Sequence, residues 1–265
     1  MCVIAISRGS FLGGKRLAEQ VARELEFRCL DREMLIDRVA AAGVDHDDLR
    51  EALTRSPSLF DRWITHRKHL YLALLQAALA EEVRDGRVVY HGYAGHLLLE
   101  GAAPVFRVRV VASPEFRLNI AQRELELDRE SALAHLHKVD QERARWTRAL
   151  YGVNWDDPSL YDMVLNLGHL FRIEDAAQVL TSTVRAQKCL EFTEASKAAM
   201  YDFALAARVN AALMSNPPTA PLHFTVRSLN SVVSIESTLE TDEQIQEVER
   251  VVRSVPGVRD LILRY

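Results

Sequence analysis

The sequence predicts an α/β protein: a three-layer α/β/α unit with a five-stranded parallel sheet, followed by a small α+β unit. Three observations predict this fold class. Five short apolar runs alternate with longer segments of helical period over the first two thirds of the chain. A glycine-rich pattern follows the first run. Near residue 220 the hydrophobic period changes to the alternation that is typical of strands.

The five apolar runs are the expected strands of the sheet. They are Cys2–Ile6, Phe27–Leu30, Val88–Tyr90, Val105–Val111 and Met163–Leu165. Continuous apolar runs are typical of central strands that helices cover on both faces. Because helical segments separate the runs, we expect parallel strands that are joined by right-handed crossovers.

The segments between the runs have helical features. An apolar stripe from Leu17 to Leu25 predicts the first helix. A pair of helices is expected between Asp31 and Asp85, with a break near Ser56-Pro57. Ser113 followed by proline and glutamate is a helix start, with the serine as the cap.

The last quarter of the chain has the pattern α-β-β-α-β. A helix is expected over Glu191–Met214, and strands over Leu222–Val226 and Val233–Leu239. A capping box at Thr241 starts the second helix, and Val258–Leu263 is the last strand. We therefore divide the chain into 1–190, a helix and linker at 191–220, and a domain at 221–265, whose first helix falls within 200–215.

Composition and charge exclude several classes of protein. The 265 residues are 48% hydrophobic and 26% charged, which excludes a disordered chain. The 33 basic and 37 acidic residues give a net charge of −4, so we do not expect a nucleic-acid partner. Because no apolar run approaches the roughly 18 residues of a membrane span, none is expected. The three distant cysteines, with no leader pattern at the start, favour reduced thiols and a cytoplasmic protein.

The strongest chemical signal lies at the junction of the first strand and the first helix. The segment from Gly9 to Lys15 fits the phosphate-binding pattern G-x-x-x-x-G-K, with Ser10, Gly13 and Gly14 inside it. Glycines let several backbone N–H groups converge on phosphate oxygens, and the following helix adds its positive dipole end. The alternative is an ordinary glycine-rich turn with a solvated Lys15. The position after the first strand favours the phosphate loop.

Arg16 is the one departure from the usual loop. A serine or threonine at this position normally binds Mg²⁺. We therefore expect the metal to be held through water, through another carboxylate or only weakly. The cluster from Asp45 to Asp48 and the pair His135 and His137 lack metal-ligand geometry, so no protein metal site is expected.

Three stretches resemble the cytidylate-kinase-like family of P-loop nucleoside monophosphate kinases. They are SRGSFLGGKRLAEQVARELEFRCLDREML, VVYHGYAGHLLLEGAAPVFRVRVVASPEFRLN and KVDQERARWTRALYGVNWDDPSLYDMVLN, and the resemblance covers roughly Met1 to Leu190. The pattern D-x-x-R followed by Y-G-x-x-W-x-D-P-x-x-Y-D-x-V-x-N is the most distinctive part. The end of the chain is similar to a BON domain, whose usual ending has the form found at Ser254–Leu261.

The resemblance implies roles for charged residues in phosphoryl transfer. It implies a helical lid that carries Arg143 and Arg148, which would act with Lys15 on the transferring phosphoryl group. ATP would be the donor, held by the glycine loop and Arg16, and Mg²⁺ would bridge its phosphates. From the residues alone, Arg143 could equally lie on a solvated helix surface with Asp140 as its neighbour.

The resemblance places the acceptor beside Asp31 and Arg32, at the carboxyl edge of the sheet, where ligands of such sheets bind. Asp31 also suits a helix cap, and the two roles are compatible. Tyr93 stands where related kinases usually carry an arginine that contacts the acceptor. A tyrosine can stack on a base or donate one hydrogen bond, but it does not neutralise a phosphate. This departure leaves the acceptor open.

The leading hypothesis is ATP-dependent phosphoryl transfer to a small acceptor, a nucleoside monophosphate such as CMP. The alternative is a nucleotide-binding regulator with little or no catalysis, whose BON-like tail recruits a partner or a ligand. Arg16 and Tyr93 motivate this alternative. The exposed sheet edge of the tail is also a candidate for contact with a protein partner or a second copy of the chain.

Overall fold

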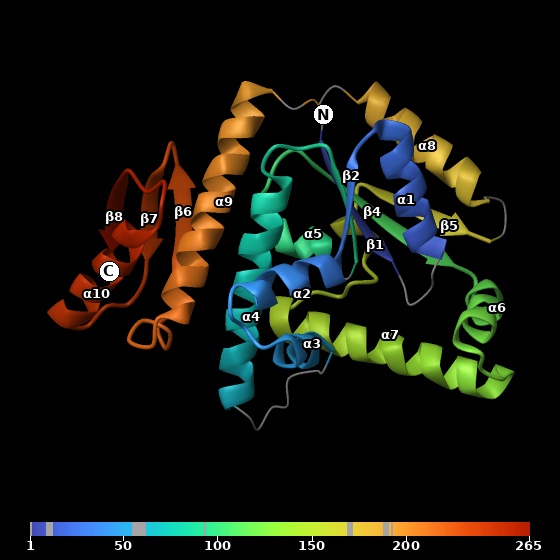
Figure 1. Ribbon diagram of the computed structural model, residues 1–265, viewed down its shortest axis with the longest axis horizontal. Coiled ribbons are helices and arrows are strands. Elements are labelled where there is room, and N and C mark those ends of the chain that lie inside the picture. The colour runs from blue at the N-terminus through green and yellow to red at the C-terminus, as the bar shows by residue number, and fades with distance from the viewer. Residues whose placement is uncertain are drawn as a thin grey trace.

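The sheet domain is built on five parallel strands in the order β2-β3-β1-β4-β5 (Figure 1). The computed structural model describes residues 2–8, 13–54, 62–92, 94–168, 172–187, 191 and 193–265. The strands are β1 (Val3–Arg8), β2 (Arg28–Asp31), β3 (Val88–Gly92), β4 (Val105–Ala112) and β5 (Met163–Leu167). All five predicted strands are therefore confirmed, and so is their parallel arrangement.

Helices cover both faces of the sheet. The helices α1 (Gly13–Leu25) and α8 (Ile173–Ala186) share one core with the sheet. The opposite core receives side chains from α2 (Arg32–Ala41), α3 (His46–Thr54), α4 (Arg62–Val83) and α5 (Gly95–Leu98). The helices α6 (Pro114–Leu125) and α7 (Arg129–Tyr151) pack against each other, and the long α7 extends along the carboxyl edge of the sheet (Figure 1). The predicted three-layer α/β/α class is confirmed.

The segment between β2 and β3 differs from its prediction. Three helices, rather than a pair, occupy it among the described residues. Gly43 adopts a left-handed φ of 98°, and the carboxylate of Asp45 accepts the backbone N–H of Asp48 at 2.8 Å. This local cap ends one helix and starts another, which a hydrophobic pattern does not reveal. The predicted break at Ser56-Pro57 lies outside the described residues.

The C-terminal unit has the predicted element order. It contains α9 (Glu194–Ser215), β6 (Thr225–Leu229), β7 (Val232–Glu236), α10 (Asp242–Ser254) and β8 (Asp260–Arg264). Its sheet has the order β6-β7-β8, with β6 antiparallel and β8 parallel to β7. The first strand begins later than predicted because a turn holds Leu222, whose N–H donates to the Thr219 carbonyl at 2.9 Å. The BON-like character and the domain boundaries stay predictions.

Helix α9 contributes to the cores of both units (Figure 1). Met200 is buried in the sheet domain, whereas Leu205, Val209 and Leu213 are buried against the small sheet. A single helix thus joins the tail to the body through packed side chains.

Asp202 attaches the same helix to the β6–β7 turn. Its carboxylate accepts the Ser228 hydroxyl at 2.6 Å and the backbone N–H groups of Asn230 and Ser231 at 2.7 and 2.9 Å. Both turn residues have positive φ, as a tight hairpin requires. Among the described helices, none has the length and apolar character that crossing a membrane would require.

Candidate nucleotide-binding and phosphoryl-transfer site

The start of α1 approaches the end of β1 too closely for a side chain. A Cβ atom on Gly14 would lie 2.6 Å from Cβ and 2.7 Å from Cδ of Arg8, so only glycine fits there. Gly13 is also buried. Gly9 and Ser10 lie outside the described residues. In the described half of the pattern the Arg8 side chain therefore packs directly on the backbone of Gly14, at the start of the helix whose N-terminal N–H groups could meet a phosphate.

Lys15 lies in the first turn of α1 with its side chain 44% exposed. Its Nζ atom is 3.9 Å from Glu19 Oε1, an i,i+4 contact. The first turn of α1 contains no acidic residue, so the positive end of the helix dipole is not offset by its own side chains. A lysine and a helix N-terminus together form a local positive potential beside the sheet edge.

The side chain of Arg16 contacts α6. Its guanidinium lies 3.4 Å from Glu124 Oε1, and the side chain is 65% exposed. This contact links α1 to the pair of helices α6 and α7. The assignment of Arg16 to nucleotide binding stays a prediction.

Asp31 and His91 are neighbours across β2 and β3 at the carboxyl edge. The Asp31 carboxylate caps α2 by accepting the N–H of Met34 at 2.9 Å, as the sequence predicted for its structural role. Arg32, the first residue of α2, lies 3.5 Å from the Glu33 carboxylate. Tyr93 lies outside the described residues. The roles of Asp31, Arg32 and Tyr93 in acceptor binding stay predictions.

His91 also lies at this edge, although no role was predicted for it. The residue is only 2% exposed. Burial, together with the charge of Arg8 and to a smaller extent Lys15, lowers the pKa of His91 to about 4, and Asp31 opposes this effect. The imidazole is therefore neutral at neutral pH. Burial also lowers the pKa of Arg8 itself. A polar residue within the apolar run of β3 was the available signal.

Arg143 reaches from α7 to the end of the central strand. Its guanidinium donates a hydrogen bond to the carbonyl of Arg8 at 3.1 Å. Arg148 lies five residues further along the helix, which turns it to another face, where it is exposed. Thus the structure brings Arg8, Lys15, Asp31, His91 and Arg143 to one edge of the sheet, and it leaves Arg148 on the outer surface of α7. The catalytic roles of Lys15, Arg143 and Arg148 stay predictions.

The distinctive W-x-D-P-x-x-Y-D segment follows the C-terminal end of α7 and packs against β4. Arg109 of β4 stacks over the Trp155 and Tyr161 rings, at 4.6 and 5.6 Å from their centroids. It also donates to the Trp155 carbonyl and to Asp156, and the Tyr161 hydroxyl donates to the same carbonyl at 2.9 Å. These contacts fix the chain after α7 to the middle of the sheet, which positions the helix that carries Arg143.

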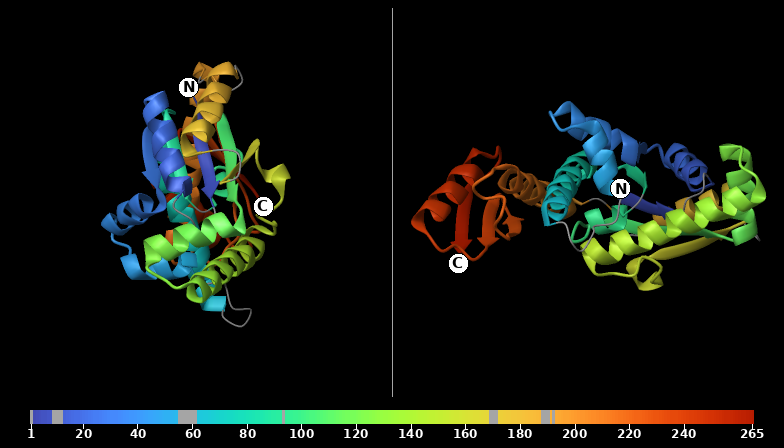
Figure 2. Two further views of the ribbon diagram at one scale, coloured as in Figure 1. Left: turned by 90° about the vertical axis from the view of Figure 1, so that its right-hand side faces the viewer. Right: turned by 90° about the horizontal axis from the view of Figure 1, so that it is seen from below.

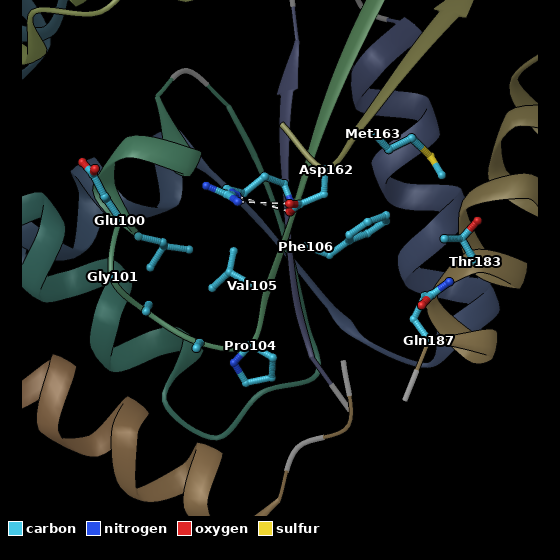
Figure 3. Close-up of a pocket in the computed structure, with 13 residues that line it drawn as sticks. Glu100, Gly101, Pro104, Val105, Phe106, Asp162, Met163, Thr183 and Gln187 are labelled. Atoms are coloured by element: carbon cyan, nitrogen blue, oxygen red, sulfur yellow. Dashed lines mark hydrogen bonds and ion pairs between the residues drawn. The ribbon is translucent and has the colours of Figure 1, made fainter. Parts of the chain in front are cut away.

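One cavity lies beside the candidate site and another lies away from it. A cavity of about 200 Å³ lies beside the helix pair, lined by Arg109, Arg117, Asp140 and Asp156. A cavity of about 570 Å³ lies at the opposite edge, at the amino ends of β4 and β5, where the ion pair of Arg107 and Asp162 forms part of its wall (Figure 3). The larger cavity is therefore separated by the length of the strands from the candidate phosphate site.

The residues present fit a phosphorylated nucleotide better than a protein-held metal. The Gly14 approach, Lys15 and the α1 N-terminus suit phosphate oxygens. Within the described ranges, no group of three or more histidine, cysteine, aspartate or glutamate side chains is arranged to hold a metal ion. At the Asp45 cluster, the His46 ring lies 3.1 Å from Asp37. A divalent ion at this site would be held mainly by the phosphates of the nucleotide.

The sheet order, the glycine-lysine turn after the central strand and the helix pair over the carboxyl edge define a kinase-like α/β protein. The model of the cytidylate kinase-like family matches residues 3–169, and the chain belongs to this family. The predicted family is thereby confirmed for the sheet domain. The match ends before α9 and the small sheet.

Among the solved structures that match, one with a TM-score above 0.5 supports the same fold. An uncharacterized protein from Eubacterium ventriosum aligns with a TM-score of 0.54 and 16% identity, over 70% of this chain and 99% of that one. A shikimate kinase from Bacteroides thetaiotaomicron aligns with a TM-score of 0.43 and 15% identity, over 69% of this chain and 98% of that one. A dephospho-CoA kinase from Campylobacter jejuni aligns with a TM-score of 0.39 and 9% identity, over 69% of this chain and 96% of that one. No curated protein matches the chain.

Proposed function

We propose that this protein transfers the γ-phosphoryl group of ATP to a small acceptor, with a nucleoside monophosphate such as CMP as the first candidate. The observation that carries this proposal is that groups suited to phosphate binding lie together at one edge of the sheet. Gly14, which packs against Arg8, and Lys15 lie at the start of α1, and Arg143 of α7 donates to the carbonyl of Arg8, the last residue of β1. Membership of a cytidylate kinase-like family supports the same reaction class.

The proposed reaction needs positioning and charge neutralisation more than covalent catalysis. An oxygen of the acceptor phosphate attacks the γ-phosphorus, the bond from γ-phosphorus to the bridging oxygen breaks, and ADP leaves with that electron pair. Lys15 would bind the donor phosphates as a point charge. Arg143 would bind the equatorial oxygens of the transferring group, for which a planar guanidinium is suited. Mg²⁺ would neutralise donor charge, and we assign it no protein ligand.

The acceptor pocket is proposed around Asp31 and Arg32, next to the neutral His91. A neutral imidazole can exchange hydrogen bonds with a base or a sugar without repelling Lys15 and Arg8. This combination fits a nucleoside with one phosphate, because the phosphate would bind Arg32 and the nucleoside would contact uncharged groups such as the His91 ring.

A coupled assay of ADP release tests the proposal across CMP, UMP, dCMP, AMP and GMP, and also shikimate as a non-nucleotide control. Acceptor-dependent ADP release by one nucleoside monophosphate is the expected result. Folded protein that releases no ADP above the acceptor-free rate with any of these compounds would contradict it.

The second candidate is a nucleotide-binding regulator with little catalysis. The contact between Arg16 and Glu124 favours it, because the position that usually binds the metal is engaged with α6 instead. The same protein sample distinguishes the two functions. Saturable ATP binding without ADP release supports the regulator, and turnover supports the kinase.

A further inference from the structure

Strand β8 forms a free edge of the small sheet. In the order β6-β7-β8, no strand of the described residues lies on the outer side of β8. This edge lies on the side of the tail that faces away from α9 and the five-stranded sheet (Figure 1). An exposed strand edge pairs readily with another strand unless the chain prevents it. We propose that β8 pairs in antiparallel orientation with β8 of a second copy of this chain, giving a two-fold dimer with a six-stranded tail sheet.

The sequence of β8 is complementary to itself in that orientation. The strand reads Asp260-Leu261-Ile262-Leu263-Arg264. When two copies run antiparallel about Ile262, each Asp260 lies opposite the partner's Arg264, and each Leu261 lies opposite the partner's Leu263. Opposite charges that face each other across strands attract, and like charges repel. Any shift of register by two residues would lose both ion pairs, so the charges also select the register.

The backbone of β8 is oriented for this pairing. The carbonyl of Arg264 accepts the N–H of Ser237 at 3.1 Å, so it points toward β7. Backbone groups alternate in direction along a strand, which turns those of Leu261 and Leu263 toward the free edge. The N–H of Leu261 donates to the carboxylate of the adjacent Asp260 at 2.8 Å rather than to β7, and on pairing this local bond would be exchanged for one to the carbonyl of the partner's Leu263. The Ile262 positions then form a non-hydrogen-bonded pair, in which side chains approach most closely.

Side chains on both faces of the edge suit a second copy. Ile262 lies on the outer face and is 46% exposed, although it is a large aliphatic residue. Leu261 and Leu263 face the core of the tail and are half-buried at its margin. Arg264 lies 3.5 Å from Glu236 and remains largely exposed, so a second carboxylate can approach it. Pairing would cover all three aliphatic residues and place Arg264 between two acids.

The alternative interpretation is that the charges protect the edge against pairing. Charges of one sign at both ends of the strand would repel a second copy in the antiparallel orientation. Here the two ends carry opposite signs, which is the arrangement that favours it. Because β8 lies far from the carboxyl edge of the large sheet in the views of Figures 1 and 2, a second copy would leave both phosphate sites open.

Charge reversal gives the decisive test, with the oligomeric state measured by sedimentation velocity. In the Asp260→Arg variant, residue 260 of each copy is an arginine that lies opposite the partner's Arg264, so the dimer contains two arginine pairs. In the Arg264→Asp variant, residue 264 of each copy is an aspartate that lies opposite the partner's Asp260, so the dimer contains two aspartate pairs. We expect each variant alone to raise the dimer dissociation constant at least about tenfold, since each dimer contains two like-charge pairs. An equimolar mixture of the two variants restores complementary pairs, so a mixed dimer is expected. The double variant D260R/R264D is expected to dimerise alone.

A disulfide tests the register independently. Ile262→Cys should form a cross-linked dimer under mild oxidation, because Cα atoms of a non-hydrogen-bonded pair lie within disulfide range. Leu229→Cys, at a 72% exposed position on the far strand, is the matched control and should give no disulfide-linked dimer, and neither should the parent protein with its native cysteines. Thermal unfolding confirms that each variant is folded.

Three outcomes would overturn the proposal. The parent protein could remain monomeric at every concentration, the dimer could survive both single charge reversals, or a variant mixture could fail to associate. Binding of ATP and release of ADP are expected to be unchanged in all these variants. The proposal therefore stands or falls separately from the proposed kinase activity.

Discussion

Replacing Lys15 with alanine separates a nucleotide-binding role from a structural one. The lysine is half-exposed, and its side chain forms an i,i+4 pair with Glu19 at 3.9 Å. Such a pair contributes at most about 0.5 kcal/mol, and less with the lysine on the N-terminal side. A cation in the first helical turn also opposes the helix dipole by about 0.3–1 kcal/mol. We therefore expect K15A, without ligand, to destabilise the fold by no more than about 0.2 kcal/mol and at most to stabilise it by about 1 kcal/mol.

The effect with nucleotide should be much larger. ATP at 100 times its dissociation constant stabilises a protein by about 2.7 kcal/mol. A charge-assisted contact contributes about 1.5–3 kcal/mol, so its loss weakens binding by roughly 10- to 150-fold. At the same ATP concentration the stabilisation would fall to about 0.3–1.4 kcal/mol. Because about 1 kcal/mol shifts the Tm by about 2–4 °C at this size, a shift of about 5–10 °C would become one of about 1–5 °C.

Differential scanning calorimetry with and without ATP measures both quantities. Glu19→Ala is the matched control, because it removes the same ion pair and retains the lysine. E19A should keep the full ATP-induced shift. If K15A keeps the same shift as E19A, then Lys15 does not bind the nucleotide and the reasoning about this edge is wrong.

Three further changes test the structure around the site. Gly14→Ala would place a Cβ atom 2.6 Å from the Arg8 side chain, so chemical denaturation should show a loss of about 1–3 kcal/mol and ATP should stabilise the variant less. Asp202→Ala removes three hydrogen bonds to the β6–β7 turn and should cost about 3 kcal/mol or more, with faster hydrogen exchange at β6. Burial lowers the pKa of His96 to about 4 from 6.5, so its neutral ring stabilises the fold above pH 6.5. That contribution is lost toward pH 4 at up to about 1.4 kcal/mol per pH unit. His96→Phe should flatten this acid slope, as measured by urea unfolding from pH 7 to pH 4.

The strands and the start of the phosphate site could be predicted because their signals are local. Each strand of the large sheet is an apolar run, and the glycine-lysine pattern directly follows the first. The helix cap at Ser113 was also predicted, and it is confirmed because the Ser113 hydroxyl accepts the N–H of Phe116 at 3.3 Å. In these cases one short segment determines its own conformation.

Other features depend on residues that are distant in the sequence. Arg109 and Trp155 stack only because β4 and the segment after α7 meet in the fold. Asp202 similarly binds a turn 26 to 29 residues away. Neither pair has a spacing that a helix or a strand would reveal. The break between α2 and α3 was missed although its signals are local, because Gly43 and the cap Asp45 interrupt the helix over only four residues, 42–45.

The electrostatics of the carboxyl edge favour a bound anion. Burial lowers the pKa of Arg8, which means that the fold disfavours its charged form. Lys15 opposes the dipole of its own helix, and the nearby histidine is held neutral. The first two arrangements destabilise the unliganded protein, and a folded chain under no functional constraint would be expected to lack them. A polyphosphate at this edge would reverse the first two effects at once, because it supplies negative charge to Arg8 and Lys15 and to the helix N-terminus. The stability that the site costs without ligand is thus an argument that nucleotide binding is its role.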